Sequence, residues 1–377
     1  MSKRQLKIGF IMDGVGLGYT SWRHPNVPSD AGENIDFQVM QAKLAESGKF
    51  DMLFITDLSH IGPESMPTHL SIFEGVSLLS ALSMMTENIG LGATIATSFA
   101  DPFTVARQMA SLDKISHGRA AWNAVTSLDG SRANNFSRSH ITKSDLYPMQ
   151  KEFLEIVERL WDSYEDDAFI RDKRSGIFLD PTKMHPINYR GHYFSVDGPL
   201  PITRSPQGRP VIIQVGTSEA FLNVAAHHAE AVMMGDATEL EYAKRFIHVL
   251  KEKVKAAGRS PHNVLATRIV HAIVGETEAD ARRKVDELER LLPPYYRMPD
   301  NPFFGSAEQV AEEIEKWYYS GAMDLMLLRQ THPETLQDFI KYVVPILQEK
   351  GIFRKEYESN TLRGNLGLPY PQNRYSI

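Results

Sequence analysis

The fold is decided by stretches such as Asp51-Met-Leu-Phe-Ile-Thr-Asp57, an apolar run that stops abruptly on a carboxylate. The same pattern recurs at residues 89–98, 119–127 and 210–218. Short runs without polar alternation predict strands buried on both faces, and such strands are parallel. In parallel α/β folds the functional groups lie at the carboxyl ends of the strands. The polar residues that end these runs are therefore expected to face one shared site, which indicates an enzyme.

The same pattern along the whole chain gives about eight strand-then-helix units, the number that a closed (β/α)8 TIM barrel needs. We therefore expect a single α/β domain over residues 1–377. Strands are predicted at residues 6–12, 52–56, 89–96, 120–125, 211–215, 231–234, 267–274 and 325–328. Helices are predicted at residues 36–47, 72–85, 104–115, 147–163, 218–229, 239–257, 278–292, 307–319 and 336–349.

Two inserts and a tail exceed a minimal barrel. Residues 128–146 are polar, and residues 164–208 are rich in proline with a predicted hairpin at 187–196. Both inserts follow the fourth predicted strand, on the face where a barrel builds its site. The tail, residues 351–377, has few apolar residues and is expected to pack over a surface or a partner subunit.

Composition and charge exclude several classes of protein. A net charge of -6 without a Lys/Arg cluster argues against nucleic-acid binding. The chain has no cysteine, which excludes disulfides, thiolate metal sites and a cysteine nucleophile. The histidines show no metal-ligand spacing, so no metal is expected. We find no signal peptide and no apolar stretch of bilayer length, so we expect a cytoplasmic protein without a membrane partner.

Several residues at the predicted strand ends have both a functional and a structural interpretation. Gly216, Thr217 and Ser218 join a strand to a helix, where backbone N–H groups and hydroxyls can bind an anion or simply cap the helix. Asp57 either faces the site or forms a cap or salt bridge. Asn123, inside an apolar strand, needs partners for its amide whichever role it has.

Taken together, the sequence resembles a known family. It is the nitrilotriacetate monooxygenase type of FMN-dependent monooxygenase, within the bacterial luciferase-like superfamily. The resemblance spans nearly the whole chain, and its specificity comes from the order and number of the matching blocks. They include Trp22-Arg-His-Pro25, residues 48–57, Ala96-Thr-Ser98, residues 116–127, Ser205-Pro-Gln207, Gly216-Thr-Ser218, residues 344–353 and Leu366-Gly-Leu-Pro369.

The resemblance implies that the protein uses reduced FMN, supplied by a separate flavin reductase, and O2 to oxygenate a small organic substrate. By position, the family's flavin contacts correspond to Asp57, Thr97, Asn123, Tyr147 and Ser218. Lys143 stands where the family usually has a histidine, and a lysine can pair with the FMN phosphate as a point charge.

The resemblance leaves the substrate open. His24, His60 and Trp122 are expected near it, with ordinary packing or a loop hydrogen bond as the alternative for each. The chain is shorter than family members between residues 292 and 304, which predicts a more open or differently lidded site. A homodimer or homotetramer is expected. Two other functions stay open: a non-catalytic flavin-binding barrel, and a deazaflavin-dependent oxidoreductase.

Overall fold

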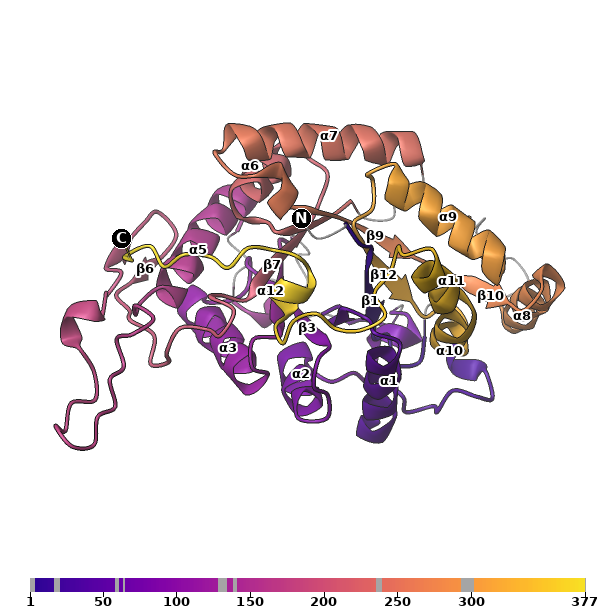
Figure 1. The fold of residues 1–377 in the computed structure, drawn as a ribbon, viewed down its shortest axis with the longest axis horizontal. Coiled ribbons are helices and arrows are strands. Elements are labelled where there is room, and N and C mark those ends of the chain that lie inside the picture. Colours follow the sequence, from indigo (N-terminus) through magenta and orange to yellow (C-terminus); the bar gives the residue numbers. More distant parts are fainter. Residues whose placement is uncertain are drawn as a thin grey trace.

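The architecture is a closed parallel barrel surrounded by helices (Figure 1). The computed structural model describes residues 4–16, 21–57, 61–63, 65–127, 134–137, 141–234, 239–292 and 302–376. Within these residues, eight parallel strands close the barrel in the order β1-β12-β9-β8-β7-β4-β3-β2, which confirms the predicted (β/α)8 fold. The strands are β1 (Lys7–Ile11), β2 (Met52–Ile55), β3 (Gly90–Ala96), β4 (Ala120–Val125), β7 (Val211–Val215), β8 (Ala231–Met233), β9 (Leu265–Val270) and β12 (Leu325–Arg329).

The strands lack polar alternation because each of their faces meets an apolar layer. Met52 and Phe54 of β2 belong to a cluster made only of strand and tail residues, which therefore fills the lumen. Leu53 and Ile55 of the same strand belong to the cluster that includes the surrounding helices. Burial on both faces is what parallel strands require.

Helices cover the outside of the barrel, close to where they are predicted. Asp101 caps α3 by accepting a hydrogen bond from the Thr104 N–H, with Pro102 in the first turn. In the described part of the chain, no helix is long and apolar enough to cross a membrane. The helices that follow the barrel strands are α1 (Ile35–Ser47), α2 (Gly75–Ser83), α3 (Pro102–Ile115), α5 (Leu146–Trp161), α6 (Glu219–His228), α7 (Leu240–Ala256), α9 (Ala307–Tyr319), α10 (Thr335–Asp338) and α11 (Val344–Glu349), the last two joined by a π-helical turn, Phe339–Val343.

One predicted strand, residues 267–274, is two strands in the structure. β9 ends at Val270, and β10 (Ile273–Gly275) leaves the barrel to pair in parallel with β11 (Phe304–Ser306). The helix α8 (Glu278–Leu291) connects β10 to β11 and packs on this small sheet through an apolar cluster of its own. The unit between β9 and β12 therefore carries an extra βαβ layer.

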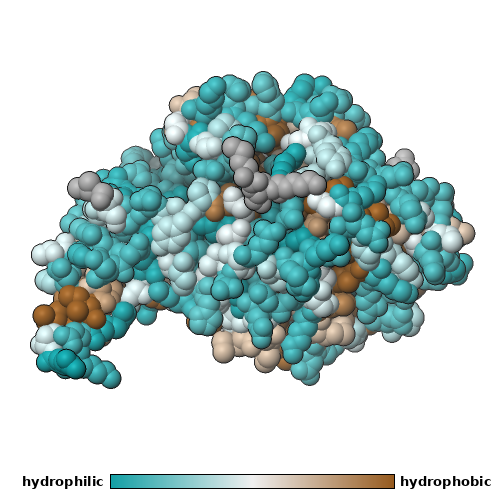
Figure 2. Space-filling model, in the orientation of Figure 1, coloured by the Kyte–Doolittle hydropathy of each residue, from teal (hydrophilic) through white to brown (hydrophobic). Residues whose placement is uncertain are grey.

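The insert at residues 164–208 includes an arm that projects from the barrel (Figure 1). Its predicted hairpin is confirmed, since β5 (Tyr189–Arg190) pairs antiparallel with β6 (Ser195–Val196). Figure 2 shows a hydrophobic patch on the arm, with a hydrophilic tip beyond it. The exposed large apolar side chains of this segment are Ile170, Ile177 and Phe178.

The tail crosses the amino ends of the barrel strands of its own chain. Leu362, in the short helix α12 (Leu362–Asn365), joins the lumen cluster. Arg354 and Asp51, at the start of β2, are both buried, and the Arg354 Nη2 donates to the Asp51 Oδ1 at 2.5 Å. The tail thus closes the end of the barrel opposite to the carboxyl rim, where the site is predicted.

Candidate active site at the carboxyl end of the barrel

Four neighbouring strands bring most of the predicted flavin contacts to one side of the carboxyl rim. Asp57 lies two residues beyond β2, Thr97 lies directly beyond β3, and Gly216 lies directly beyond β7. Asn123 lies in β4, between β3 and β7 in the barrel. We call Asp57, Thr97, Asn123 and residues 216–218 the β2–β7 arc.

Asn123 is the member of the arc that faces the lumen, since Ala121, two residues earlier, belongs to the lumen cluster. Its Nδ2 donates to the hydroxyl of Thr94, its register partner on β3, at 3.0 Å. The residue is 4% exposed, and its Oδ1 has no hydrogen-bond partner in the described structure. A buried acceptor without a partner is costly. The position therefore suits a bound group that donates a hydrogen bond.

Thr97 and Asp57 differ in how they are placed. The Thr97 side chain is buried, and its hydroxyl donates to the carbonyl oxygen of Val125 at 3.1 Å. This contact joins the ends of β3 and β4 and favours the structural interpretation of Thr97. Asp57 is half-buried on the loop after β2, where its carboxylate lies on the carboxyl side of the barrel.

The junction of β7 and α6 places a helix N-terminus at the carboxyl rim. Ser218 caps α6, with its Oγ accepting from the Phe221 N–H at 3.2 Å and its hydroxyl donating to the Tyr147 Oη at 3.2 Å. Only glycine fits at Gly216, because a Cβ there would lie 2.7 Å from the Phe221 ring. The helix N-terminus favours an anion at this position. Lys143 is exposed and lies four residues before Tyr147.

The structure corrects the expectation that Trp122 lies near the substrate. Its side chain lies on the helix side of β4, where it packs against Phe153 and Trp161 with ring centroids 5.8 and 6.2 Å away. Its Nε1 donates to the carbonyl oxygen of Ile95 at 3.2 Å. The packing alternative therefore accounts for Trp122. His60 lies outside the described residues.

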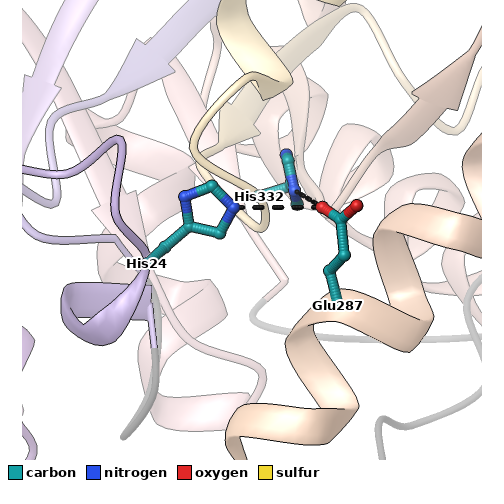
Figure 3. A group of neighbouring side chains, drawn as sticks. All are labelled: His24, Glu287 and His332. Atoms are coloured by element: carbon teal, nitrogen blue, oxygen red, sulfur yellow. Dashed lines mark ion pairs between the residues drawn. The ribbon is translucent and has the colours of Figure 1, made fainter.

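His24 lies in a cluster that the sequence analysis did not find (Figure 3). Its partners are Glu287 of α8 and His332, three residues beyond β12. The Nε2 atoms of His24 and His332 are 3.9 and 3.7 Å from the Glu287 Oε2, and the two rings meet edge to face at 5.2 Å. We call these three residues the His24–Glu287–His332 cluster. The only sequence signal for His332 is that a polar residue follows the last barrel strand, as in the β2–β7 arc.

The ends of β1 and β12 also carry an ion pair. The Arg329 Nε and Nη2 donate to the two carboxylate oxygens of Asp13 at 2.8 and 3.1 Å. Asp13 is buried, so this bidentate contact neutralises a charge that would otherwise be costly to bury. The sequence analysis missed both residues.

A parallel barrel whose carboxyl rim carries a helix N-terminus and a lumen amide with an unpartnered oxygen is typical of a cofactor-dependent barrel enzyme. The family model for luciferase-like monooxygenases matches residues 17–331. The chain belongs to this family.

Similar proteins agree with the predicted nitrilotriacetate monooxygenase type. The N-acetyl-S-(2-succino)cysteine monooxygenase of Bacillus subtilis is 39% identical over 99% of both chains. Component A of the nitrilotriacetate monooxygenase of Aminobacter aminovorans is 33% identical over 99% of this chain and 98% of its own. The solved EDTA monooxygenase from Chelativorans sp. BNC1 is 27% identical, with a TM-score of 0.86 over 98% of this chain and 100% of its own. These relatives confirm the predicted enzyme class, a monooxygenase.

Proposed function

We propose that the protein is the oxygenase component of a two-component system, which receives reduced FMN from a separate reductase and adds oxygen from O2 to a small organic substrate. The observation that carries this proposal is the β2–β7 arc, because it places a helix N-terminus and a lumen amide with an unpartnered oxygen on one side of the rim. A flavin mononucleotide has a phosphate for the first and ring N–H groups for the second.

The chemistry of these residues matches the groups of FMN. The phosphate would be held by the α6 N-terminus, Thr217, Ser218 and Tyr147, with Lys143 supplying a positive charge. The ring would be oriented by Asn123 and Asp57, while Thr97 secures the backbone beside it. Bound reduced FMN supplies the electrons that activate O2. The contribution of the protein is to orient the cofactor and to keep water from the reacting atoms.

The substrate class that the relatives favour is a small organic sulfur compound. The relative with 39% identity is named for a thioether, N-acetyl-S-(2-succino)cysteine. A dibenzothiophene-sulfone monooxygenase of Rhodococcus erythropolis is 31% identical over 98% of both chains. Other relatives are named for nitrilotriacetate and for long-chain alkanes, so aminopolycarboxylates and alkanes must also be tested as substrates.

The alternatives differ in what supports them. Two structures named as coenzyme F420-dependent are 14% and 16% identical to the chain, so their TM-scores of 0.64 and 0.63 show the shared fold alone. A non-catalytic flavin binder would need the same arc, and only an activity assay separates it from an oxygenase. A single domain, a cytoplasmic location and a homodimer or homotetramer stay predictions.

The test is a coupled assay with a flavin reductase, NADH, FMN, isotopically labelled O2 and a panel of thioethers, aminopolycarboxylates and alkanes. We expect mass spectrometry to show one labelled oxygen atom in a product, and only when reductase, FMN and the protein are all present. Riboflavin, which lacks the phosphate, should support far less turnover. FMN binding without a labelled product from any panel member would support the non-catalytic binder instead.

A further inference from the structure

The His24–Glu287–His332 cluster is held by contacts of its own. The Arg23 Nη1 donates to the carbonyl oxygen of Leu291, at the end of α8, at 2.5 Å, which ties the His24 segment to the Glu287 helix. One turn before Glu287, the Lys284 Nζ donates to the carbonyl oxygen of Val274 at 3.1 Å and to Asp338. The three side chains thus converge from three separately anchored segments (Figure 3).

Local hydrogen bonds fix which nitrogen of each ring carries the proton. The Asn26 N–H donates to the His24 Nδ1 at 3.2 Å, and the Glu334 N–H donates to the His332 Nδ1 at 3.2 Å. A neutral imidazole that accepts at Nδ1 carries its hydrogen on Nε2. Both Nε2–H groups therefore point into the cluster as donors.

This arrangement does not suit a metal ion. A metal-bound histidine gives the metal one lone pair and donates its other ring N–H to an acceptor. Here the other nitrogen of each ring already accepts a backbone N–H, so binding a metal at Nε2 would set two hydrogens against each other at Nδ1. The three atoms that converge within 4.8 Å therefore suit a bound group other than a metal ion.

The charges around the cluster keep His332 neutral. Burial, followed by the nearby Lys284, lowers the pKa of His332 to about 4, against the smaller opposing effects of Glu334 and Glu287. His332 is 2% exposed, and its Nε2 has no hydrogen-bond partner in the described structure. The Glu287 side chain is 37% exposed. The cluster therefore offers two Nε2–H donors, of which that of His332 is neutral, and one carboxylate.

A single oxygen atom satisfies all three groups. The Nε2 atoms lie 3.7 and 3.9 Å from the Glu287 Oε2, and every pair of these atoms lies within 4.8 Å. Each separation is shorter than the combined length of two hydrogen bonds of about 2.8 Å each, so one atom between them can bond to all three. A hydroxyl oxygen has two lone pairs for the two Nε2–H groups and one proton for the carboxylate. A carboxylate has no proton to donate, and both a carboxylate and a phosphate would be repelled by Glu287.

We propose that the His24–Glu287–His332 cluster binds a hydroxyl group of the substrate. The proposal rests on the proposed function, because it names a chemical group on the substrate of the same site. His24 and His332 lie in segments that follow β1 and β12, two strands on the other half of the barrel from the β2–β7 arc, so the proposal requires a substrate that extends from one half of the rim to the other.

The test uses matched thioether probes in the coupled assay. One series is the ω-hydroxyalkyl methyl sulfides with two to six methylene groups, and its partners are alkyl methyl sulfides of the same chain lengths. At the chain length that fits, we expect kcat/KM for the hydroxylated probe to exceed that of its partner by about tenfold or more, because without the hydroxyl the buried donors stay unpaired. Equal kcat/KM values at every length would overturn the proposal, whereas no turnover of any compound in the wider panel would count against the proposed function.

Variants separate recognition from folding. His332→Phe should abolish the preference for the hydroxylated probe while turnover of its partner persists, and His332→Gln, which keeps a donor near Nε2, should restore part of it. Glu287→Gln changes only a half-exposed side chain, and it should reduce the preference several-fold. His185→Phe, in a separate His185–Glu165 pair on the arm, is the matched control and should change nothing.

Three further measurements can overturn the proposal. Two need no turnover, and the third uses an acidic probe. In nitrogen NMR at pH 7, the His332 ring should be neutral and both rings should carry a proton on Nε2; a neutral ring with its proton on Nδ1 instead would contradict the argument. Zn2+ titrated into the protein should not bind at the cluster. Binding of one equivalent that is lost in His332→Phe would show a metal site instead. An ω-carboxyalkyl methyl sulfide turned over by the wild type in preference to the hydroxylated probe would show a site for anions instead.

Discussion

Replacing Arg363 by methionine should strongly destabilise the protein, because it leaves Glu230 buried without its main partner. The Arg363 Nη1 and Nη2 donate to the two carboxylate oxygens of Glu230 at 2.6 and 3.0 Å, and both residues are buried. The guanidinium also donates to the carbonyl oxygens of Pro369 and Arg209, each at 3.2 Å. This contact anchors the tail across the amino end of the barrel.

The magnitude follows from the carboxyl group. Burial is the largest single influence on Glu230 and would raise its pKa, but Arg363, Arg209 and the hydrogen bonds from Arg363 and Ile212 together outweigh it and lower the pKa from 4.5 to about 2. At about 1.4 kcal/mol per pKa unit, the folded environment, burial included, stabilises the ionised form by about 3 kcal/mol. Removing one partner of a buried ion pair typically costs about 3–5 kcal/mol. We therefore expect Arg363→Met to lower the free energy of unfolding by about 3 kcal/mol at pH 7.

Urea unfolding followed by tryptophan fluorescence measures this loss. The double variant Arg363→Met/Glu230→Gln should recover much of it, since no buried charge is left unpaired. Because the folded pKa of Glu230 lies below its unfolded value, the stabilisation is complete above about pH 4.5 and is lost as the pH falls toward about 2. The stability difference between wild type and double variant should shrink over that range. A loss below about 1 kcal/mol in the single variant, or a double variant no more stable than the single, would refute this reasoning.

Three further predictions concern the site. Ser218→Asp places a charge against the phosphate and should weaken FMN binding about tenfold, or about 1.4 kcal/mol, in a fluorescence titration; Ser260→Asp is the control, and equal affinity in both variants would contradict the phosphate position. Lys143→Ala should weaken FMN binding and reduce its dependence on salt, because salt screens the lost charge pair; an unchanged salt dependence would mean that Lys143 only faces solvent. Trp122→Phe removes the hydrogen bond to Ile95 and should cost about 1 kcal/mol of stability, while a large rise in KM would restore Trp122 as a substrate contact.

The barrel was predictable because burial on both faces leaves a plain signature. Two predicted strands, Ala120–Val125 and Val211–Val215, have the bounds that the structure gives them. The same signature hides which residues face the lumen, since a strand without polar residues has no alternation to reveal its two faces. Trp122 was expected near the substrate, but it is the neighbour of the lumen-facing Asn123 in β4 and therefore packs against the helices.

The parts that could not be predicted depend on contacts between distant segments. Glu287 lies on a helix whose exposed face is polar along its whole length, and only the position of α8 beside His24 and His332 singles it out. The tail has few apolar residues, and its course became clear only where Leu362 enters the lumen cluster. The division of residues 267–274 into two strands follows from the pairing of β10 with β11, a partner about thirty residues further along the chain.

The most direct test of the central claim is the reaction of reduced FMN with O2, followed by stopped-flow absorbance with and without saturating protein. If the protein binds reduced FMN and keeps water from the reacting atoms, the absorbance of oxidised FMN should return along a different time course from that of free flavin. A substrate from the panel should change that time course again. Identical rates and spectra for free flavin and for flavin with saturating protein and every candidate substrate would contradict the assignment as a flavin-dependent oxygenase.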